Sequence, residues 1–268
     1  MTLPVVGSLD STVVRGAVQI GAALVVVAVV LVGTRLWGFE AAFERDVVGA
    51  LGRGVVQLLV VGSVVGLLFT VPLPASAVVL AAMMLGGALI ARRRAAEFPD
   101  AFRVSLAAVV VGPSLVVAAM LAGGVVDPTV RNLVPVGSMI IANGMKTSSL
   151  ALERFTGELD DHRAEVEALL SLGVPAGRTV DRPLRRGVQS SLVPVVDSLR
   201  SLGFVWIPGL MAGMVLGGAD PVYAAEYQFA VMTAIFAASA LTSLACGFLL
   251  RSRAFTDADR LRDFDEAV

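Results

Sequence analysis

Long stretches of this chain contain no charged side chain. No Asp, Glu, Lys or Arg occurs in 54–91, and further charge-free stretches cover 16–34, 104–126 and 227–250. A helix needs about 20 mainly apolar residues to cross a bilayer. Inside lipid, backbone polar groups must be paired within the protein, and an α-helix meets this requirement on its own. The sequence therefore predicts an all-α fold, a polytopic bundle of transmembrane helices.

The composition excludes several other classes of protein. Hydrophobic residues make up 56% of the chain and charged residues only 16%, against about a quarter in soluble domains. The net charge is −1, which indicates no nucleic-acid partner. With one Cys (Cys246) and one His (His162), we expect neither a disulfide framework nor a His-based metal cluster.

The sequence also lacks common catalytic and nucleotide-binding motifs. H-E-x-x-H, C-x-x-C and G-x-S-x-G are all absent. The stretch around Gly144 and Lys146 superficially resembles a phosphate-binding loop, but the Lys does not directly follow the Gly, and no strand is expected before it. We therefore predict no enzymatic activity, no cofactor and no ATP site in this chain.

The charge-free stretches predict seven spans within a single transmembrane domain, 1–268. The expected spans are about 17–34, 54–71, 74–91, 104–124, 132–150, 190–217 and 223–250. Asn143 and Lys146 interrupt the fifth span. The sixth contains Pro194 and Pro208, either of which could kink it or split it in two. A six-span alternative leaves the first helix lying in the membrane interface.

Arginine residues in alternate connections predict the orientation. Lys and Arg are retained on the cytoplasmic side of a membrane. The arginine-rich connections, after spans one, three, five and seven, hold Arg35, Arg45, Arg53, Arg92, Arg93, Arg94, Arg103, Arg154, Arg163, Arg178, Arg182, Arg185, Arg186, Arg251, Arg253, Arg260 and Arg262. The other connections hold almost none. We expect an inner-membrane protein with its N-terminus outside and its C-terminus in the cytoplasm.

The longest cytoplasmic connection, 152–187, is predicted to contain a short amphipathic helix. The helix ends at Gly173, and glycine is the favoured residue just after a helix. One interpretation places this helix on anionic lipid head groups. The other makes it a coupling helix docked on a partner ATPase, because its Glu-Ala-x-x-x-Leu-Gly pattern resembles the cytoplasmic loop of ABC transporter permeases. The predicted coupling residues are Glu165, Ala168, Leu169, Leu172 and Gly173.

Further segments resemble one permease family more specifically. They are 134–145 (VPVGSMIIANGM), 194–198 (PVVDS), 207–213 (IPGLMAG) and 227–228 (YQ). They are similar to the Fet-type iron-export ABC permeases, a family that includes plant relatives linked to aluminium tolerance. The resemblance implies a permease that pairs with a separate ATPase and exports a metal ion, iron, from the cytoplasm. We expect the permease to be a homodimer. The alternatives are an ABC permease for another substrate and a stand-alone secondary transporter.

Polar groups within the spans are the candidates for a transport pathway, because such groups are costly in lipid. The predicted pathway residues are Gln57, Met139, Asn143, Met145, Asp197, Ser198, Met211 and Glu226. Asp197 and Asn143 could hold a metal ion transiently, since carboxylate and amide oxygens suit hard cations. The alternatives are an ion pair between Asp197 and Arg200, an interhelical hydrogen bond from Asn143, and ordinary packing by the methionines.

The second half of the sixth span carries three glycines spaced four residues apart. Gly209, Gly213 and Gly217 therefore form a smooth stripe on one face of a helix. Such stripes allow helices to approach closely, so we expect packing within the subunit or across a homodimer. Pro208, directly before Gly209, could also form a hinge between inward-facing and outward-facing states.

Overall fold

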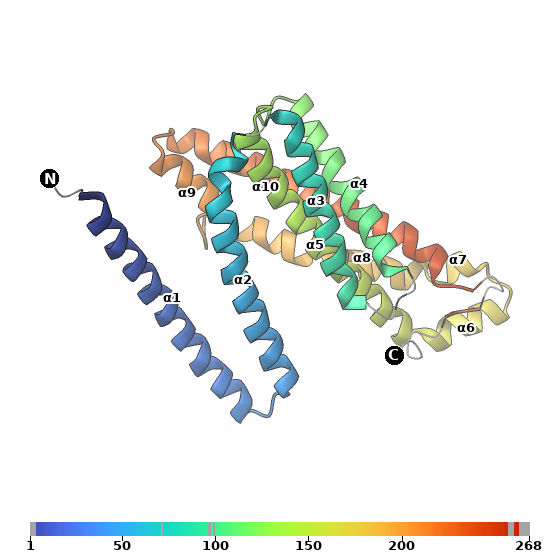
Figure 1. Cartoon of the computed structure of the whole chain (residues 1–268). Coiled ribbons are helices and arrows are strands. Elements are labelled where there is room, and N and C mark those ends of the chain that lie inside the picture. The colour runs from blue at the N-terminus through green and yellow to red at the C-terminus, as the bar shows by residue number, and fades with distance from the viewer. Residues whose placement is uncertain (1–3, 71, 96–97, 99, 257–259, 263–268) are drawn as a thin grey trace. The chain divides into compact units, whose positions relative to one another are not determined.

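The computed structural model describes residues 4–70, 72–95, 98, 100–256 and 260–262. Over these residues the chain forms ten α-helices, one short 3-10 helix and no strand, apart from two isolated β-bridges (Figure 1). The helices are α1 (Pro4–Leu36), α2 (Ala41–Leu68), α3 (Leu73–Ala91), η1 (Arg92–Ala95), α4 (Ala101–Ala122), α5 (Val130–Asp161), α6 (Arg163–Ser171), α7 (Ala176–Thr179), α8 (Asp181–Ser201), α9 (Gly209–Leu216) and α10 (Pro221–Arg253). The all-α prediction is confirmed.

The chain divides into two compact units, and the first ends at Leu68. It is a hairpin of α1 and α2, and in the connection Gly38 has φ +83°, a conformation that favours glycine. Arg35 and Glu44 lie 3.9 Å apart across the hairpin end. Large apolar side chains are exposed along both helices. Such a surface suits lipid far better than water.

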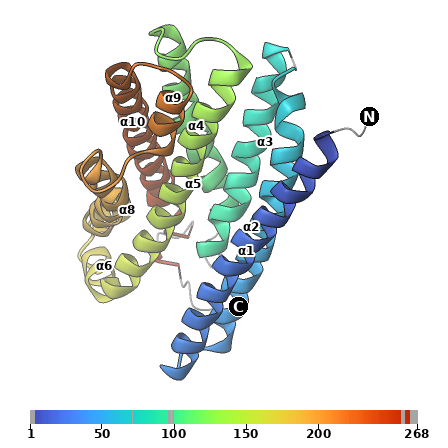
Figure 2. The ribbon, with the colours of Figure 1, turned by 90° about the vertical axis from the view of Figure 1, so that its left-hand side faces the viewer.

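The second unit, from Phe69 onward, is a helical bundle. The helices α3, α4, α8 and α10 surround α5, which contacts all four, and α9 packs on α10 (Figure 2). The most extensive helix–helix contact is between α4 and α10. The second unit therefore has a buried core of three hydrophobic clusters, to which no described residue of α1 or α2 contributes.

Five of the described helices are long and apolar enough to cross a membrane. They are α1 over Val14–Leu36, α2 over Ala41–Ser63, α3, α4 and α10. Four of these match the predicted spans at 17–34, 74–91, 104–124 and 223–250. The second span was expected at 54–71, but α2 begins earlier, because the charged residues near its start do not interrupt the helix. Glu44 lies in its first turn, where a negative charge is favourable.

The fifth and sixth predicted spans differ from the expected ones. Residues 132–150 belong to one longer helix, α5, whose final third is rich in charged residues. The sixth, 190–217, is not continuous, because α8 ends at Ser201 and α9 begins at Gly209. Neither helix region is among the five that meet the length and hydropathy requirement within the described residues.

A tight turn separates α8 from α9. Gly203 has φ +74°, and its N–H donates to the carbonyl of Trp206 at 3.1 Å. The indole N–H of Trp206 donates to Ser201 Oγ at 3.1 Å. Pro194 lies inside α8 without ending it, whereas Pro208 directly precedes α9. The split in the sixth span therefore occurs on the N-terminal side of Pro208, and not at Pro194.

The connection predicted over 152–187 is also shorter than expected. Its first part, to Asp161, continues α5, and its last part, from Asp181, begins α8. Only α6, α7 and the short links around them lie between these two helices. As a result, α6 is joined almost directly to two long helices of the bundle.

Small residues bring α4, α5 and α10 into close contact. A Cβ placed on Gly112 of α4 would lie 2.8 Å from both the carbonyl oxygen of Ala238 and the amide nitrogen of Thr242, and would overlap Thr242 Oγ1. A Cβ on Gly144 of α5 would lie 2.9 Å from Pro113 Cγ. These distances are below those of real Cβ contacts, so the three helices can approach in this way only because both positions are glycine.

The glycine stripe of the sixth span has a different environment. No atom lies within 4 Å of a Cβ placed on Gly209 or Gly213, and one on Gly217 would meet only carbonyl groups of its own helix. In the described part of the chain, the stripe therefore packs against no neighbouring helix. Its packing across a homodimer stays a prediction.

Candidate functional site

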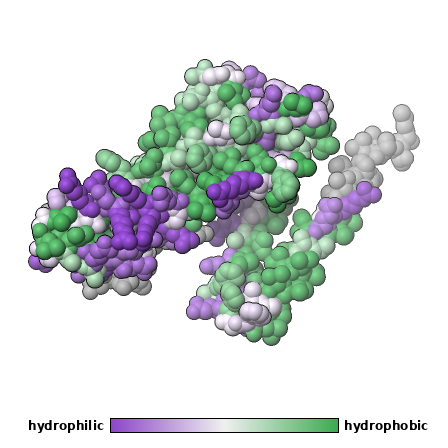
Figure 3. Space-filling view, turned by 180° about the vertical axis from the view of Figure 1, so that it is seen from behind, coloured by the Kyte–Doolittle hydropathy of each residue, from purple (hydrophilic) through white to green (hydrophobic). Residues whose placement is uncertain are grey.

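Hydrophilic side chains gather at one end of the second unit. Figure 3 shows them over the end that carries α6 and α7, whereas apolar atoms dominate the rest of the bundle. We call this region, formed by α6, α7 and the adjoining ends of α5, α8 and α10, the α6 end. It contains all the residues predicted to couple transport to an ATPase.

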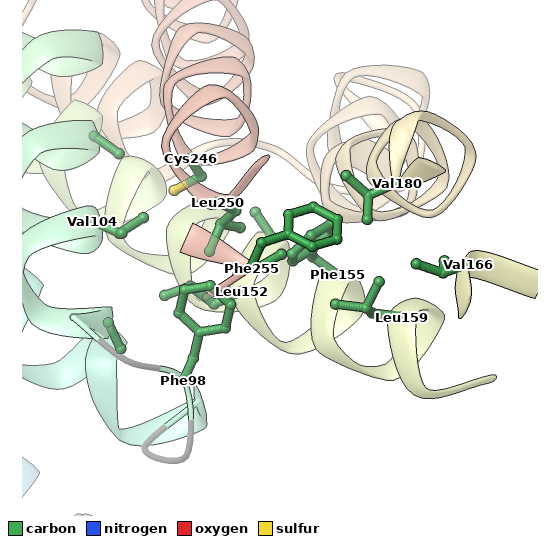
Figure 4. Packing of buried hydrophobic residues seen from close by; sticks show 14 residues of the cluster. Phe98, Val104, Leu152, Phe155, Leu159, Val166, Val180, Cys246, Leu250 and Phe255 are labelled. Atoms are coloured by element: carbon green, nitrogen blue, oxygen red, sulfur yellow. The ribbon is translucent and has the colours of Figure 1, made fainter. Parts of the chain in front are cut away.

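A hydrophobic cluster lies beneath the α6 end and fixes the inner face of α6 (Figure 4). Val166 of α6 is 1% exposed and joins Leu159 and Phe155 of α5 in this cluster. Phe98 packs edge-on against Phe155, with ring centroids 6.4 Å apart. Burying such side chains stabilises this arrangement by about 1.5–3 kcal/mol each. The helix α6 is therefore anchored to the core of the bundle.

The outer face of α6 is open. Glu165 and Ala168 are exposed, Leu169 is half-buried, and Leu172 is 79% exposed. Gly173 has φ +82°, and the N–H groups of Gly173 and Val174 donate to the carbonyls of Leu170 and Leu169 at 3.0 and 3.1 Å. This is the Schellman pattern of helix termination, so the predicted stop at Gly173 is confirmed.

Ion pairs connect α6 and its neighbours to three long helices. Arg182 of α8 lies 3.3 Å from Glu165 of α6, and Arg186 of α8 lies 3.5 Å from Glu158 of α5. From α10, Arg251 lies 3.2 Å from Asp181. Exposed pairs contribute little to stability, about 0–1 kcal/mol each. The pairs join α6 to α8, and α8 in turn to α5 and to α10.

Inside the bundle, hydroxyl and thiol groups form a polar seam along α10. Ser148 of α5 lies 3.4 Å from Cys246 Sγ, and Ser191 of α8 lies 2.7 Å from Ser243 Oγ. All four residues are buried. Hydrogen bonds of this kind link transmembrane helices where lipid provides no hydrophobic drive. These contacts link α5 and α8 to α10 in the buried interior of the bundle.

Three buried polar residues of α10, Gln228, Ser239 and Thr242, have no hydrogen-bond partner among the described residues. Gln228 is 2% exposed, and neither its Oε1 nor its Nε2 has a hydrogen-bond partner among the described residues. An unpaired buried polar group costs about 1–3 kcal/mol. Gln228 lies about two turns from the start of α10, and its two unpaired amide atoms make it a candidate for a role beyond packing. The sequence contains a signal for this residue, a Gln within the charge-free stretch 227–250, but the predicted pathway does not include it.

The predicted pathway residues are dispersed over several helices. Asn143, Met139 and Met145 lie on α5, Asp197 and Ser198 on α8, Met211 on α9 and Glu226 on α10, while Gln57 is exposed on α2 in the first unit.

The two predicted metal ligands bond locally instead of to each other. Asn143 Nδ2 donates to the Met139 carbonyl of its own helix at 2.8 Å, which is not the interhelical bond considered as its alternative. Asp197 is exposed and lies 3.2 Å from Arg200 Nη1, so the ion pair considered as its alternative is present. Over the described residues, no group of three His, Cys, Asp or Glu side chains could hold a metal ion. The transient metal role of both residues stays a prediction.

Comparisons with known proteins cover both units of the chain. The family model described as "Uncharacterised protein family (UPF0014)" matches residues 17–255. The "UPF0014 membrane protein YjkA" of Bacillus subtilis is 30% identical over 226 residues, which cover 84% of this chain and 90% of that protein. No solved structure shows a significant match.

Two further relatives have names that mention a metal. The "Probable iron export permease protein FetB" of Escherichia coli is 26% identical over 224 residues, covering 83% of this chain and 86% of that protein. The "Protein ALUMINUM SENSITIVE 3" of Arabidopsis thaliana is 26% identical over 249 residues, covering 92% and 90%. These relatives confirm the resemblance noted in the sequence. With its apolar helices and a family match over most of its length, the chain is a multi-pass membrane protein that belongs to the UPF0014 family.

Proposed function

We propose that this protein is the permease subunit of an ABC-type exporter, driven by a separate ATPase and carrying a metal ion out of the cytoplasm. The observation that carries the proposal is α6, whose inner face is anchored in the core while its outer face stays open. The name of the Escherichia coli relative, a probable iron export permease, supports an exporter and makes iron the first candidate for the cargo.

In this mechanism the α6 end lies in the cytoplasm, with the C-terminus inside and the N-terminus outside. The ATPase binds the open face of α6 through Leu172 and the other predicted coupling residues. Nucleotide-driven closure of the ATPase then displaces α6. Because Val166 is buried in the core and Glu165 is paired with Arg182, α5, α8 and α10 must move with it. A homodimer of the permease, with two ATPase chains, completes the proposed assembly.

The proposed pathway combines the predicted polar residues with Gln228. The amide oxygen of Gln228 is a hard ligand of the type that suits hard cations, and it is unpaired among the described residues. Asp197, near the C-terminal end of α8, and Glu226, near the N-terminal end of α10, are both exposed. Both lie toward the end of the bundle away from α6, where cargo could be released.

The proposal is tested by purifying the tagged full-length protein from its own cells and assaying metal content. We expect an ABC-type ATPase to co-purify, and cells lacking both proteins to accumulate iron, which only re-expression of both reverses. Export by this protein without the ATPase would instead identify a stand-alone secondary transporter. Accumulation of another metal with unchanged iron would identify an ABC permease for a different substrate.

Replacing Gln228 with leucine should raise stability while lowering export. Leucine has a similar volume and no polar atom, so the variant removes two unpaired buried groups and should stabilise the fold by about 1–3 kcal/mol. Thermal unfolding of the purified protein and metal export in cells measure the two effects.

The control is Gln19→Leu, since Gln19 is exposed on α1 and its replacement should leave stability and export unchanged. A lower unfolding midpoint for Gln228→Leu would mean that the amide is paired in the folded protein. A raised midpoint with wild-type export would remove Gln228 from the pathway.

A further inference from the structure

A groove lies on the surface of the second unit between α8 and α10. Its volume is about 550 Å³. Leu184 and Val188 of α8 and Leu244 and Phe248 of α10 form its apolar walls. Leu244 and Phe248 are 59% and 78% exposed, so the described residues leave much of this apolar surface uncovered.

Glycine at one position allows the two helices to form the groove. A Cβ placed on Gly247 of α10 would lie 3.1 Å from Val188 Cγ2 and 3.4 Å from Leu184 Cδ1. The two helices therefore approach closely at Gly247, and the larger side chains around it form the walls of the groove. The groove is a consequence of regular helix packing and needs no irregular backbone.

Two arginines lie at one end of the groove. Arg251 of α10 is held in place, because its Nε donates to the Gly177 carbonyl at 2.8 Å and its Nη2 lies 3.2 Å from Asp181 Oδ1. Arg185 of α8 is exposed, and among the described residues it forms no ion pair. With one carboxylate against two guanidinium groups, this end of the groove has a net positive charge.

The polarity of the groove changes along its length in one direction. Leu244 and Arg251 are separated by about two helical turns, roughly 10 Å. The stretch 227–250 of α10 has no charge, and Arg251 is its first charged residue on this side. Arginine at the end of an apolar helix lies at the level of the lipid head groups. The basic end of the groove is therefore interfacial, and its apolar part faces the hydrocarbon.

We infer that this groove binds an anionic phospholipid of the leaflet next to the α6 end. Arg185 and Arg251 contact the phosphate, and an acyl chain lies along Leu244 and Phe248. The order of polar and apolar groups in the groove matches the order in a phospholipid. Basic pockets between transmembrane helices are suited to anionic head groups. A bound lipid would contact α8 and α10. Because Arg251 also donates a hydrogen bond to the Gly177 carbonyl, the lipid phosphate would lie next to a residue that holds the α6 end.

The experiment measures lipid binding to the purified full-length protein by native mass spectrometry. The probes are palmitoyl-oleoyl phosphatidylglycerol and the matching phosphatidylcholine. We expect preferential binding of phosphatidylglycerol, and we expect Arg185→Gln to weaken it about fivefold, the effect of one basic residue near a membrane surface. The matched control is Arg154→Gln, since Arg154 is likewise exposed and outside the groove, and it should bind as the wild type does.

Two outcomes would overturn the assignment of the head-group site. Unchanged phosphatidylglycerol binding by Arg185→Gln would show that this arginine contacts no phosphate. An equal loss with Arg154→Gln would show that only the overall charge of the α6 end matters. Thermal unfolding without added lipid establishes that both variants are folded.

A second arm distinguishes a lipid from a soluble anion. Glycerol phosphate, which has the phosphate but no acyl chain, should bind at least about a hundredfold more weakly, because burial of each methylene contributes about 0.8 kcal/mol. Leu244→Ala should weaken phosphatidylglycerol binding in the same assay. Equal binding of glycerol phosphate, or no effect of Leu244→Ala, would contradict the acyl-chain part of the inference.

Discussion

Replacing Gly112 with leucine should largely prevent α4 and α10 from packing together. The first carbon of any side chain at this position would overlap Thr242 Oγ1 and lie 2.8 Å from two backbone atoms of α10. Backbone atoms cannot move aside as the end of a flexible side chain can. Overpacking usually costs about 1–3 kcal/mol, and more where nothing can yield. We expect a loss of at least about 3 kcal/mol, seen as a much lower thermal unfolding midpoint and poor recovery of folded protein from detergent.

The matched control for this variant is Gly86→Leu. Gly86 lies inside α3, where a Cβ would have no atom within 4 Å. Removing a helical glycine should itself stabilise the helix by roughly 0.5–1 kcal/mol. Wild-type stability in Gly112→Leu, or an equal loss in Gly86→Leu, would contradict the close approach of α4 and α10.

Changing Leu172 to aspartate should abolish coupling to the ATPase while leaving the fold intact. Leu172 is 79% exposed, so its replacement disturbs no internal contact. On docking, the aspartate would be an unpaired charge buried in an apolar contact, which costs about 3 kcal/mol or more and corresponds to at least about a hundredfold in affinity. The affinity for the ATPase, the stimulation of ATP hydrolysis and metal export should therefore all fall together.

Leu172→Met provides the control, because methionine keeps the apolar surface and should retain export. The unfolding midpoints of both variants should equal that of the wild type. If Leu172→Asp exports metal at the normal rate, the ATPase does not dock on this face of α6, and the lipid-surface interpretation of the helix gains support.

Hydropathy predicted most of the fold because the membrane itself imposes it. The span 104–124 corresponds to α4 and the span 223–250 lies within α10, since long apolar stretches have few alternatives in lipid. The stop of α6 at Gly173 followed from local backbone chemistry. The ion pair of Asp197 with Arg200 followed from their spacing on one helix.

The features that the sequence did not predict depend on contacts between helices. The burial of Gln228 requires neighbours that a single helix does not specify. The turn before Pro208 is held by the bond from Trp206 to Ser201, which no local pattern indicates. Likewise, the side chain of Asn143 donates a hydrogen bond within its own helix, although an amide side chain could equally bond to another helix.

The burial of Cys246 has a practical consequence for topology. It is the only cysteine of the chain, and it is fully buried against Ser148. A maleimide reagent that cannot cross the bilayer should therefore leave the native thiol untouched. A cysteine introduced at the tip of α6 or near either terminus would be the sole reactive position, so its labelling in intact and opened cells reports sidedness without first removing the natural thiol.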